Sequence, residues 1–236
     1  MTRLILALQL MTRLPLPQVR AEEKDFAAAI RWFPASGIVV GLAIAAALAI
    51  GIRTDPWLAA LLGLIAWVAV TGALHLDGLG DIADGAGAAH GDRAKLSAVL
   101  ADPHIGSFGV VAVVLQLLAK LILLRLCAEQ VPPIILVAVP FIARIGPLSW
   151  TLWLPPLHQG LASRFRDGLG VGHLLGWAAL AAALCLVIPA LLAAAVLIPL
   201  WAWWLHSRIG GIAGDGHGAG IELVESGLLV ALVLVR

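Results

Sequence analysis

Long runs of apolar residues, separated by short polar segments, dominate the chain. A transmembrane helix needs about 20 predominantly apolar residues, and several stretches approach or exceed that length. They lie at about 34–52, 56–75, 107–127, 132–153, 173–206 and 219–236. The stretch at 173–206 is too long for one crossing, and Pro189 near its middle predicts a turn between two helices. The pattern predicts an all-α, polytopic integral membrane protein with about seven transmembrane helices.

The N-terminal segment differs from these stretches. Its apolar residues are interrupted by Gln9 and Thr12, and no small-residue cleavage site follows them. We expect a retained amphipathic segment rather than a signal peptide. Neither an internal repeat nor a low-complexity linker divides the sequence. Residues 1–236 are therefore expected to form a single integral-membrane domain.

The composition agrees with a bilayer environment. Hydrophobic residues make up 61% of the chain and charged residues only 12%, with a mean hydropathy of +1.02, whereas soluble domains contain about 25% charged residues. A net charge of +1 lacks the basic excess of nucleic-acid-binding proteins. Cys127 and Cys185 lie in or beside apolar stretches and are expected to be buried thiols. We expect contact with lipid and none with nucleic acid.

Basic residues predict the orientation of the spans. With a cytoplasmic N-terminus, seven spans place most basic residues on the cytoplasmic side, as the positive-inside rule requires. These are Arg3, Arg13, Arg20, Lys24, Arg31, Arg93, Lys95, Arg164, Arg166 and Arg208, against Arg53, Arg125 and Arg236 outside. Loops expected at about 76–106, 154–172 and 207–218 would then all be cytoplasmic. This one-sided clustering favours a cytoplasm-facing active site over a pathway across the bilayer.

The run from His75 to Gly85 reads His-Leu-Asp-Gly-Leu-Gly-Asp-Ile-Ala-Asp-Gly. Asp77, Asp81 and Asp84 stand at i, i+4 and i+7, so on a helix they share one face. Adjacent carboxylates repel one another unless a cation bridges them, and oxygen ligands without cysteine favour Mg²⁺ or Mn²⁺ over zinc. Such a magnesium ion usually completes its shell with water and substrate phosphates. The run predicts a metal-dependent phosphate site with glycines that leave room for the ligand; a solvated acidic helix end is the alternative.

Two further groups of residues lie beside this run. Asp102 and His104 precede the stretch at 107–127 and suit either a helix start or a contact with substrate, where His104 could act as a base. Arg93 and Lys95 suit either membrane anchoring or phosphate binding. The sequence alone leaves these alternatives open.

A second polar cluster runs from Gly210 to Glu225. Its closely spaced glycines predict a flexible loop whose backbone N–H groups could approach a phosphate. Glu222 and Glu225 then enter the last apolar stretch about one turn apart, where acids should meet a cation or face the protein interior. The cluster also supplies Asp215 and His217, and it falls on the same predicted side as the aspartate run.

At these residues the chain resembles the cobalamin synthase family, the adenosylcobinamide-GDP ribazoletransferases, over nearly its whole length. The segment 71–85 with its three aspartates carries the most specific part of the resemblance. Further matches are residues 10–17, Trp32-Phe33-Pro34 with Gly37, Gly160-Leu161 with Phe165, and Gly214-Asp215 with Glu222. The family pattern has an arginine and hydroxyl side chains where this chain carries His104, Ala213, Gly216 and His217. These departures concern substrate contacts, whereas all the carboxylates are present.

The resemblance implies a transferase of the cell inner membrane that completes adenosylcobalamin (vitamin B12) assembly. A ribose hydroxyl of α-ribazole, or of its 5′-phosphate, would attack adenosylcobinamide-GDP and release GMP. The resemblance also allows association of the protein with other cobalamin-assembly enzymes. Together with the acidic pattern, it predicts Mg²⁺ on Asp77, Asp81, Asp84 and Glu222. The expected catalytic residues are Asp77, Asp81, Asp215 and His217, and the expected substrate contacts are His75, Arg13, Asp102, His104 and Gly214. Which of Asp215, Glu222 and His217 completes the metal site or accepts the hydroxyl proton stays open.

Two other functions fit parts of the pattern. Phosphatidyltransferase-like and prenyltransferase-like membrane enzymes also bind diphosphates through aspartates and Mg²⁺, although their aspartate spacings differ from this one. An ion-coupled transporter could use Glu222 and Glu225 with Lys120 and Arg144. The one-sided clusters and the absence of an inverted repeat argue against a transporter. Local pairing or snorkelling is the simpler interpretation of Lys120 and Arg144.

Overall fold

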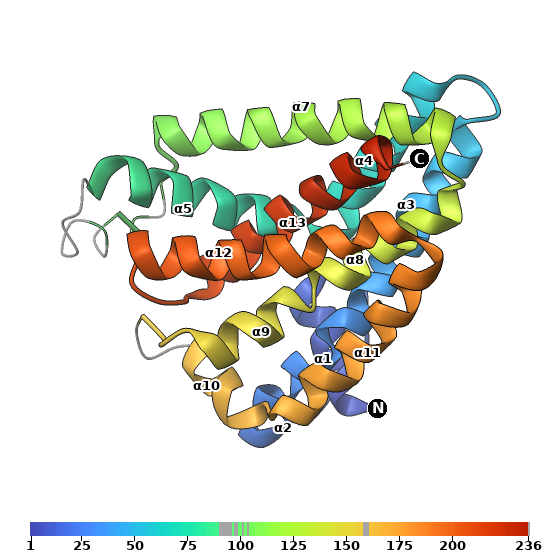
Figure 1. The fold of residues 1–236 in the computed structure, drawn as a ribbon. Coiled ribbons are helices and arrows are strands. Elements are labelled where there is room, and N and C mark those ends of the chain that lie inside the picture. Colours follow the sequence, from blue (N-terminus) through green and yellow to red (C-terminus); the bar gives the residue numbers. More distant parts are fainter. Residues whose placement is uncertain (90–95, 97–98, 101, 103, 158–160, 236) are drawn as a thin grey trace.

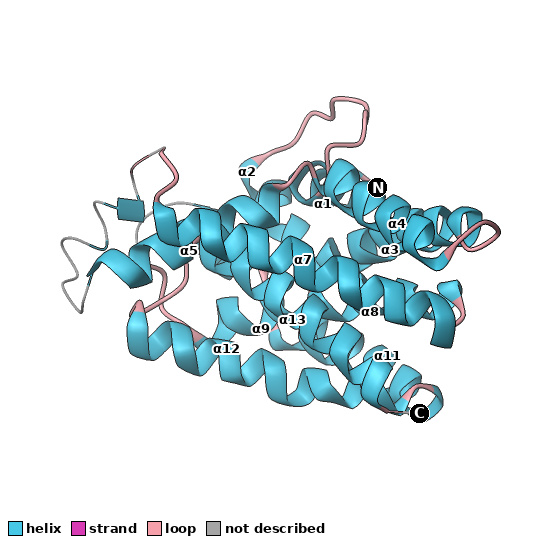
Figure 2. Ribbon diagram, turned by 90° about the horizontal axis from the view of Figure 1, so that it is seen from above, coloured by secondary structure: helices cyan, strands magenta, loops and turns pink. Residues whose placement is uncertain are grey.

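The computed structural model describes residues 1–89, 96, 99–100, 102, 104–157 and 161–235, so Arg93 and Lys95 lie outside the described residues. The described part is helical and contains no β-strand (Figures 1 and 2). Its α-helices are α1 (Thr2–Met11), α2 (Glu23–Ala28), α3 (Phe33–Gly51), α4 (Pro56–Thr71), α5 (Leu74–Ala89), α7 (Ser107–Gln130), α8 (Ala138–Ala143), α9 (Gly146–Trp153), α10 (Leu161–Gly168), α11 (Val171–Val187), α12 (Ala194–Arg208) and α13 (Gly214–Leu234). The 3₁₀ helices η1 (Ala29–Trp32), η2 (Pro133–Val137) and η3 (Pro189–Ala193) lead directly into α3, α8 and α12. The all-α prediction is confirmed.

Fewer helices than expected are long and apolar enough to cross a membrane. Within the described residues there are five, or six if the bent pair α4–α5 counts as one span. They are Glu23–Gly51, Ser107–Gln130, Pro133–Trp153, Pro189–Arg208 and Gly214–Leu234. The predicted turn in the long apolar stretch is confirmed, because α11 ends at Val187 and η3 begins at Pro189. The predicted count of about seven is not confirmed, since α11 is too short to qualify.

A sharp bend separates α4 from α5. Gly72 ends α4 with a φ of 62° and Ala73 follows with a φ of 58°. Both values belong to the left-handed region, which glycine adopts without strain and alanine does not. The axes of the two helices differ by 84°. The acidic run therefore lies in a helix that turns away from α4, and the prediction of a loop over 76–106 is wrong for residues 76–89.

The N-terminal segment forms α1, which packs against η1 and α3. Leu6, Ala7 and Met11 are buried on its inner side. The amphipathic character predicted for this segment thus places one helical face against the protein core. After α1, the backbone N–H of Arg13 donates to the carbonyl of Val70 at 2.8 Å, which ties the N-terminal segment to the end of α4.

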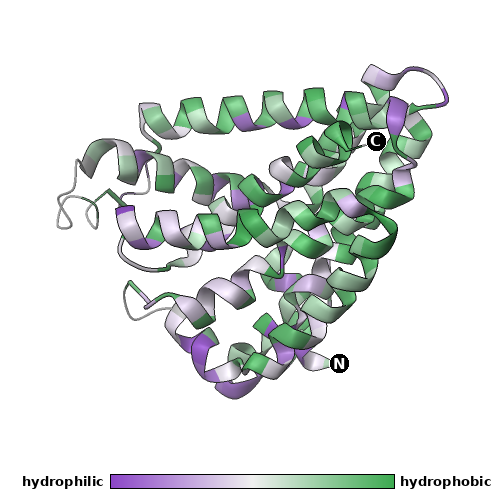
Figure 3. Cartoon of the chain, in the orientation of Figure 1, coloured by the Kyte–Doolittle hydropathy of each residue, from purple (hydrophilic) through white to green (hydrophobic). Residues whose placement is uncertain are grey.

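Helix α13 lies at the centre of the bundle, where it packs against α5, α7, α8, α9 and α12 (Figure 2). Hydrophobic residues cover most of α3, α7 and α11, whereas hydrophilic residues gather on α2 and α10 (Figure 3). The far end of α5 and the connection from α12 to α13 lie at the left of Figure 1. The turns from α3 to α4 and from α11 to η3 lie at the right. The bundle therefore has two distinct ends, and the start of α13 faces the same end as α5.

Candidate active site

Glycines bring α5 and α13 into close contact. A Cβ atom on Gly78 would lie 2.9 Å from the carbonyl oxygen of Asp215, and one on Gly218 would lie 3.2 Å from the Cα of His75. Small residues at such crossings let helix backbones approach closely in membrane proteins. The crossing places the acids of α5 beside the first turn of α13. Its glycines were expected to make room for a ligand, but at these two positions they make room for the other helix.

The second glycine cluster is also mainly helical. Helix α13 begins at Gly214, so the predicted flexible loop at 207–218 is limited to the few residues that precede it. Gly216 and Gly220 pack against neighbouring side chains, the latter against Trp150 and Trp201. Gly214 differs, because a Cβ there would meet nothing within 4 Å. Among the glycines of α13 named here, it is the one with open space beside it, as a substrate contact requires.

The carboxylate of Asp81 lies close enough to those of Asp77 and Asp215 to interact with them electrostatically. Asp77 is exposed, whereas Asp81 and Asp215 are partly buried. The carboxylate of Asp81 is repelled by those of Asp215, Asp77 and Asp84. A cation bound between these carboxylates would reduce their mutual repulsion. The structure thus brings together two predicted sites that lie more than a hundred residues apart in sequence.

Asp84 has a different role from the metal ligand that we expected. Its two carboxylate oxygens accept the backbone N–H groups of Gly106 at 2.6 Å and Gly109 at 2.9 Å. These are the otherwise unpaired donors at the start of α7, where a carboxylate is favoured. The side chain is buried. The third aspartate of the run therefore holds α7 against α5.

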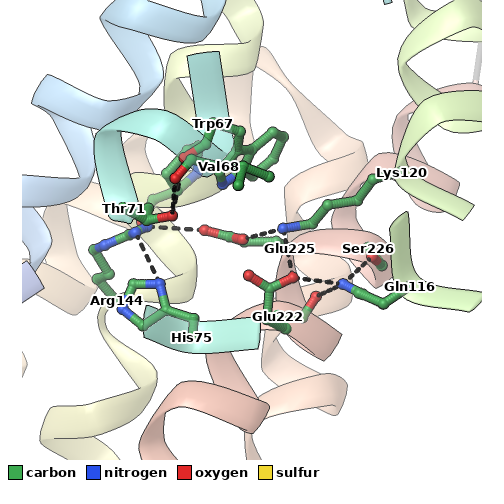
Figure 4. A network of polar contacts seen from close by, with 11 residues as sticks. Trp67, Val68, Thr71, His75, Gln116, Lys120, Arg144, Glu222, Glu225 and Ser226 are labelled. Carbon is green, nitrogen blue, oxygen red and sulfur yellow. Dashed lines mark hydrogen bonds and ion pairs between the residues drawn. The ribbon is translucent and has the colours of Figure 1, made fainter. Parts of the chain in front are cut away.

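Glu222 is likewise placed elsewhere than expected. Its carboxylate lies 2.8 Å from the Lys120 ammonium and accepts a hydrogen bond from Gln116 at 2.8 Å (Figure 4). Glu225 pairs with Lys120 at 2.7 Å and with Arg144 at 2.8 Å. All four charged side chains are buried. Two acids and two bases thus neutralise one another, as local pairing predicted, and Glu222 already has a cationic partner.

A cavity of about 210 Å³ lies beside the crossing of α5 and α13. Four of the predicted site residues with polar side chains line it: His75, Asp77, Asp215 and His217, together with Gly214. Its remaining walls come from α1, the start of α3 and α10, and from Leu74, Gly218 and Ile221 of the two crossing helices. Sequence reasoning gave no role to the apolar side chains of these walls, because the segments that carry them are far apart in the chain. Among the described residues, no group of three or more acids, histidines or cysteines is arranged closely enough to hold a metal by itself.

Both cavity histidines are buried, and each has one ring nitrogen without a protein partner. His75 Nδ1 lies 3.5 Å from a guanidinium nitrogen of Arg144, and its Nε2 has no partner. His217 Nε2 lies 3.4 Å from the hydroxyl of Thr151, and its Nδ1 has no partner. The His217 ring also stacks on Trp150 at a centroid distance of 6.1 Å. Buried polar atoms usually find a partner, so these two nitrogens are an unusual feature of the crossing of α5 and α13.

The other predicted substrate contacts lie outside the cavity. The Asp102 carboxylate accepts the backbone N–H of His104 at 3.0 Å and lies 2.7 Å from its ring Nδ1. These two interactions hold the pKa of Asp102 below its usual value. Both side chains are largely exposed. Arg13 is exposed as well, and its aliphatic stem crosses the bend at Gly72, where a Cβ would collide with it.

Comparison with known proteins gives a consistent result over the whole chain. The family model described as cobalamin-5-phosphate synthase matches residues 3–233. Proteins named adenosylcobinamide-GDP ribazoletransferase are 56% identical in Novosphingobium aromaticivorans, over 98% of this chain and 95% of the relative, and 47% identical in Thiobacillus denitrificans, over 100% and 98%. A relative of the same name in Brevibacillus brevis is 34% identical over 96% of each chain. No solved structure matches. The chain therefore belongs to the cobalamin-5-phosphate synthase family, and it is a transferase.

Proposed function

We propose that the protein joins α-ribazole, or its 5′-phosphate, to adenosylcobinamide-GDP with release of GMP. The named relatives support the substrates. The observation that carries the proposal is the convergence of Asp77, Asp81 and Asp215 beside a cavity that Asp77 and Asp215 line. An acidic surface of this kind binds a diphosphate when a cation accompanies the phosphates.

We further propose that the cation is Mg²⁺. The carboxylates of Asp77, Asp81 and Asp215 are hard oxygen donors, and none of the described groups forms a closed metal cage. This donor set fits an ion that takes one or two carboxylates and leaves its other positions to water and phosphate. When bound, the ion would offset the charge of the diphosphate and of the leaving GMP. Asp84 and Glu222 are left out of the ligand set because α7 and Lys120 already engage them.

The chain's own residues would orient the acceptor and handle its proton. Asp77 and Asp215 border the cavity from two different helices, so each is placed to accept the proton of a ribose hydroxyl held there. The rigid crossing of α5 and α13 fixes the two acids relative to each other, and positioning of this kind supplies much of the rate in phosphoryl transfer.

We also propose that this end of the bundle is the cytoplasmic one and that the membrane is the inner membrane. The far end of α5 and the start of α13 face one end of the bundle, and the distribution of basic residues along the sequence predicts that the loops at this end are cytoplasmic. Basic residues concentrate on the cytoplasmic side of membrane proteins. A cysteine introduced at Gly214 should react with a membrane-impermeant thiol reagent in inverted vesicles and not in intact cells. The reverse labelling pattern would place the site on the opposite face.

A reconstituted assay tests the function directly. The purified protein, in detergent or lipid, is incubated with adenosylcobinamide-GDP, Mg²⁺ and, in parallel samples, α-ribazole or its 5′-phosphate, and the cobalamin or cobalamin 5′-phosphate product and GMP are quantified. We expect both products in equal amounts, their loss on chelation with EDTA, and recovery when Mg²⁺ is restored. A folded sample that forms neither product would overturn the proposed function. A sample that forms both products in EDTA would overturn the role of magnesium alone.

A further inference from the structure

One buried guanidinium contacts both of the helices that carry the acids. Arg144 directly follows α8, and its side chain is fully buried. One of its terminal nitrogens donates to the carboxylate of Glu225 on α13 at 2.8 Å, and the other lies 3.5 Å from His75 Nδ1 on α5 (Figure 4). Because arginine can only donate hydrogen bonds, this nitrogen of His75 is the acceptor. A single planar group thus joins α5 to α13.

Electrostatic repulsion opposes the contact between these two helices. The carboxylate of Asp81 on α5 is repelled by that of Asp215 on α13. The backbones also approach closely, since a Cβ on Gly78 would lie 2.9 Å from the carbonyl oxygen of Asp215. Like charges held near each other away from bulk water raise the energy of the folded protein. Attractive contacts elsewhere on the two helices must offset this repulsion.

In the described part of the chain, two side chains of α5 form hydrogen bonds with other helices, one on each side of the acids. Asp84 caps α7 beyond them. His75 meets Arg144 two residues before Asp77. The contact at His75 passes directly to α13, because the same guanidinium holds Glu225.

The first turn of α5 requires such an anchor. Ala73, which immediately precedes this helix, has a φ of 58°, and the left-handed conformation costs a residue with a side chain about 1–2 kcal/mol. The axis of α5 is turned by 84° from that of α4, so α4 does not continue into α5 as one stiff rod. A strained backbone persists only where surrounding contacts hold it. His75 lies in this first turn and supplies one such contact.

Helix α13 is fixed on its side of the bridge by further polar contacts. Lys120 lies 2.7 Å from the carboxylate of Glu225 and 2.8 Å from that of Glu222. Gln116 donates to the backbone carbonyl of Glu222 at 2.9 Å and to its carboxylate at 2.8 Å. These contacts set the rotation of α13 about its own axis. Asp215 precedes Glu222 by seven residues, or about two turns, so the same contacts set the direction in which Asp215 points.

We propose that Arg144 is a positioning residue of the reaction, which holds His75 and Glu225 at once and so fixes the acids of α5 relative to the acid of α13. The inference rests on the proposed function for the reaction that these acids serve. The role requires a guanidinium, because two nitrogens of one rigid plane point at two partners. A lysine would keep the positive charge beside Glu225 but would lack the second, rigidly placed nitrogen.

Two substitutions break the bridge without removing the charge of Arg144. Arg144→Lys retains the cation, and His75→Leu removes the acceptor while the pair of Arg144 with Glu225 stays intact. In the reconstituted assay we expect each variant to lower kcat at least tenfold, since a misplacement of about 1 Å can cost a hundredfold in rate. Each should also raise the Mg²⁺ concentration that gives half the maximal rate.

The matched control is Arg125→Lys. It makes the same substitution in another arginine–glutamate pair, with Glu129 at 2.6 Å on α7, beside Trp57 at the start of α4. This control should retain the wild-type kcat and Mg²⁺ requirement.

The double variant Arg144→Lys/His75→Leu distinguishes positioning from a general loss of stability. Both changes break one contact, so the double variant should be no slower than the slower single variant. Rates are compared at a temperature at which melting curves show every variant to be folded. Losses of rate that multiply in the double variant, or a wild-type kcat in Arg144→Lys, would overturn the proposal. If Arg144→Lys fails to fold, His75→Leu decides, and a wild-type kcat there overturns it.

Binding of Mn²⁺ to the substrate-free protein, followed by electron paramagnetic resonance, keeps this inference apart from the proposed function. Mn²⁺ takes the same carboxylate and water ligands as Mg²⁺. Misplaced acids should therefore weaken its binding severalfold in Arg144→Lys and His75→Leu but not in Arg125→Lys. If the wild type forms no product, the proposed function fails and these affinities decide: weaker binding in both variants supports the positioning role, whereas equal affinities or no binding by the wild type overturn it. If product forms and Arg144→Lys matches the wild type in kcat, the function stands and the positioning role is overturned.

Discussion

The carboxylate of Asp84 accepts the backbone N–H of Gly106 at 2.6 Å, so an acid near the end of α5 caps the start of α7. The two residues are 22 positions apart, and part of the segment between them lies outside the described residues. The Oδ1 atom of Asp84 receives a second N–H, from Gly109, at 2.9 Å. A Cβ atom on either glycine would collide with the carboxylate. The acid and the two glycines therefore form one structural unit that joins two helices.

Replacement of Asp84 should affect stability before chemistry. Asp84→Ala leaves one buried and one partly buried N–H donor without an acceptor, and we expect a loss of about 1–3 kcal/mol. Thermal unfolding in detergent, followed by circular dichroism, measures the change. Asp77→Ala is the matched control, because Asp77 is exposed on the same helix and should leave the melting temperature nearly unchanged. Equal destabilisation by both variants would contradict the capping role.

Asp77→Asn and Asp81→Asn should abolish turnover while the protein stays folded and inserted in the membrane. Each change removes a negative charge from the acidic neighbourhood that we propose holds the cation, and loss of one such electrostatic group costs about 100-fold in rate or more. Product formation in the reconstituted assay measures the effect. Glu129→Gln, at the opposite end of α7 from the site, is the control. Wild-type rates in both aspartate variants would rule out a metal site on α5.

The buried ion pairs between α13 and its neighbours should be sensitive to loss of a single member. Arg144→Met leaves Glu225 buried with one cation fewer, and breaking such a pair costs about 3–5 kcal/mol. The double variant Arg144→Met/Glu225→Met removes one charge of each sign and leaves the Lys120–Glu222 pair, at 2.8 Å, intact. It should recover most of the loss. Unfolding measurements on the two variants and the wild type give the comparison, and a double variant less stable than Arg144→Met would refute it.

The crossing of α5 and α13 should not tolerate an added methyl group. A Cβ on Gly78 would press on the backbone of Asp215, so Gly78→Ala should separate the two helices and lower both activity and melting temperature. Gly176→Ala is the matched control, since a Cβ there meets nothing within 4 Å. Alanine favours a helix over glycine by about 0.5–1 kcal/mol. The control should therefore be as stable as the wild type or slightly more so.

Several features of the protein follow from local sequence because they depend on short-range chemistry. Apolar runs of membrane length predict helices, and Pro189 predicts the turn that the structure confirms. The spacing of Asp77 and Asp81 predicts a shared helical face whatever the fold around it. These signals act over one or a few helical turns and need no knowledge of distant contacts.

Tertiary structure decided how the individual acids are used. Asp77, Asp84 and Glu222 look alike in the sequence, yet one borders a cavity, one caps α7 and one pairs with Lys120. The partner of each acid comes from a distant part of the chain, and pairing strength depends on burial and distance, which spacing does not encode. The glycines show the same limit, because Gly78 and Gly218 serve a helix crossing that exists only once α5 and α13 meet. By itself, the sequence determined the helices and the chemical groups they carry; their three-dimensional packing determined which of those groups face the cavity together.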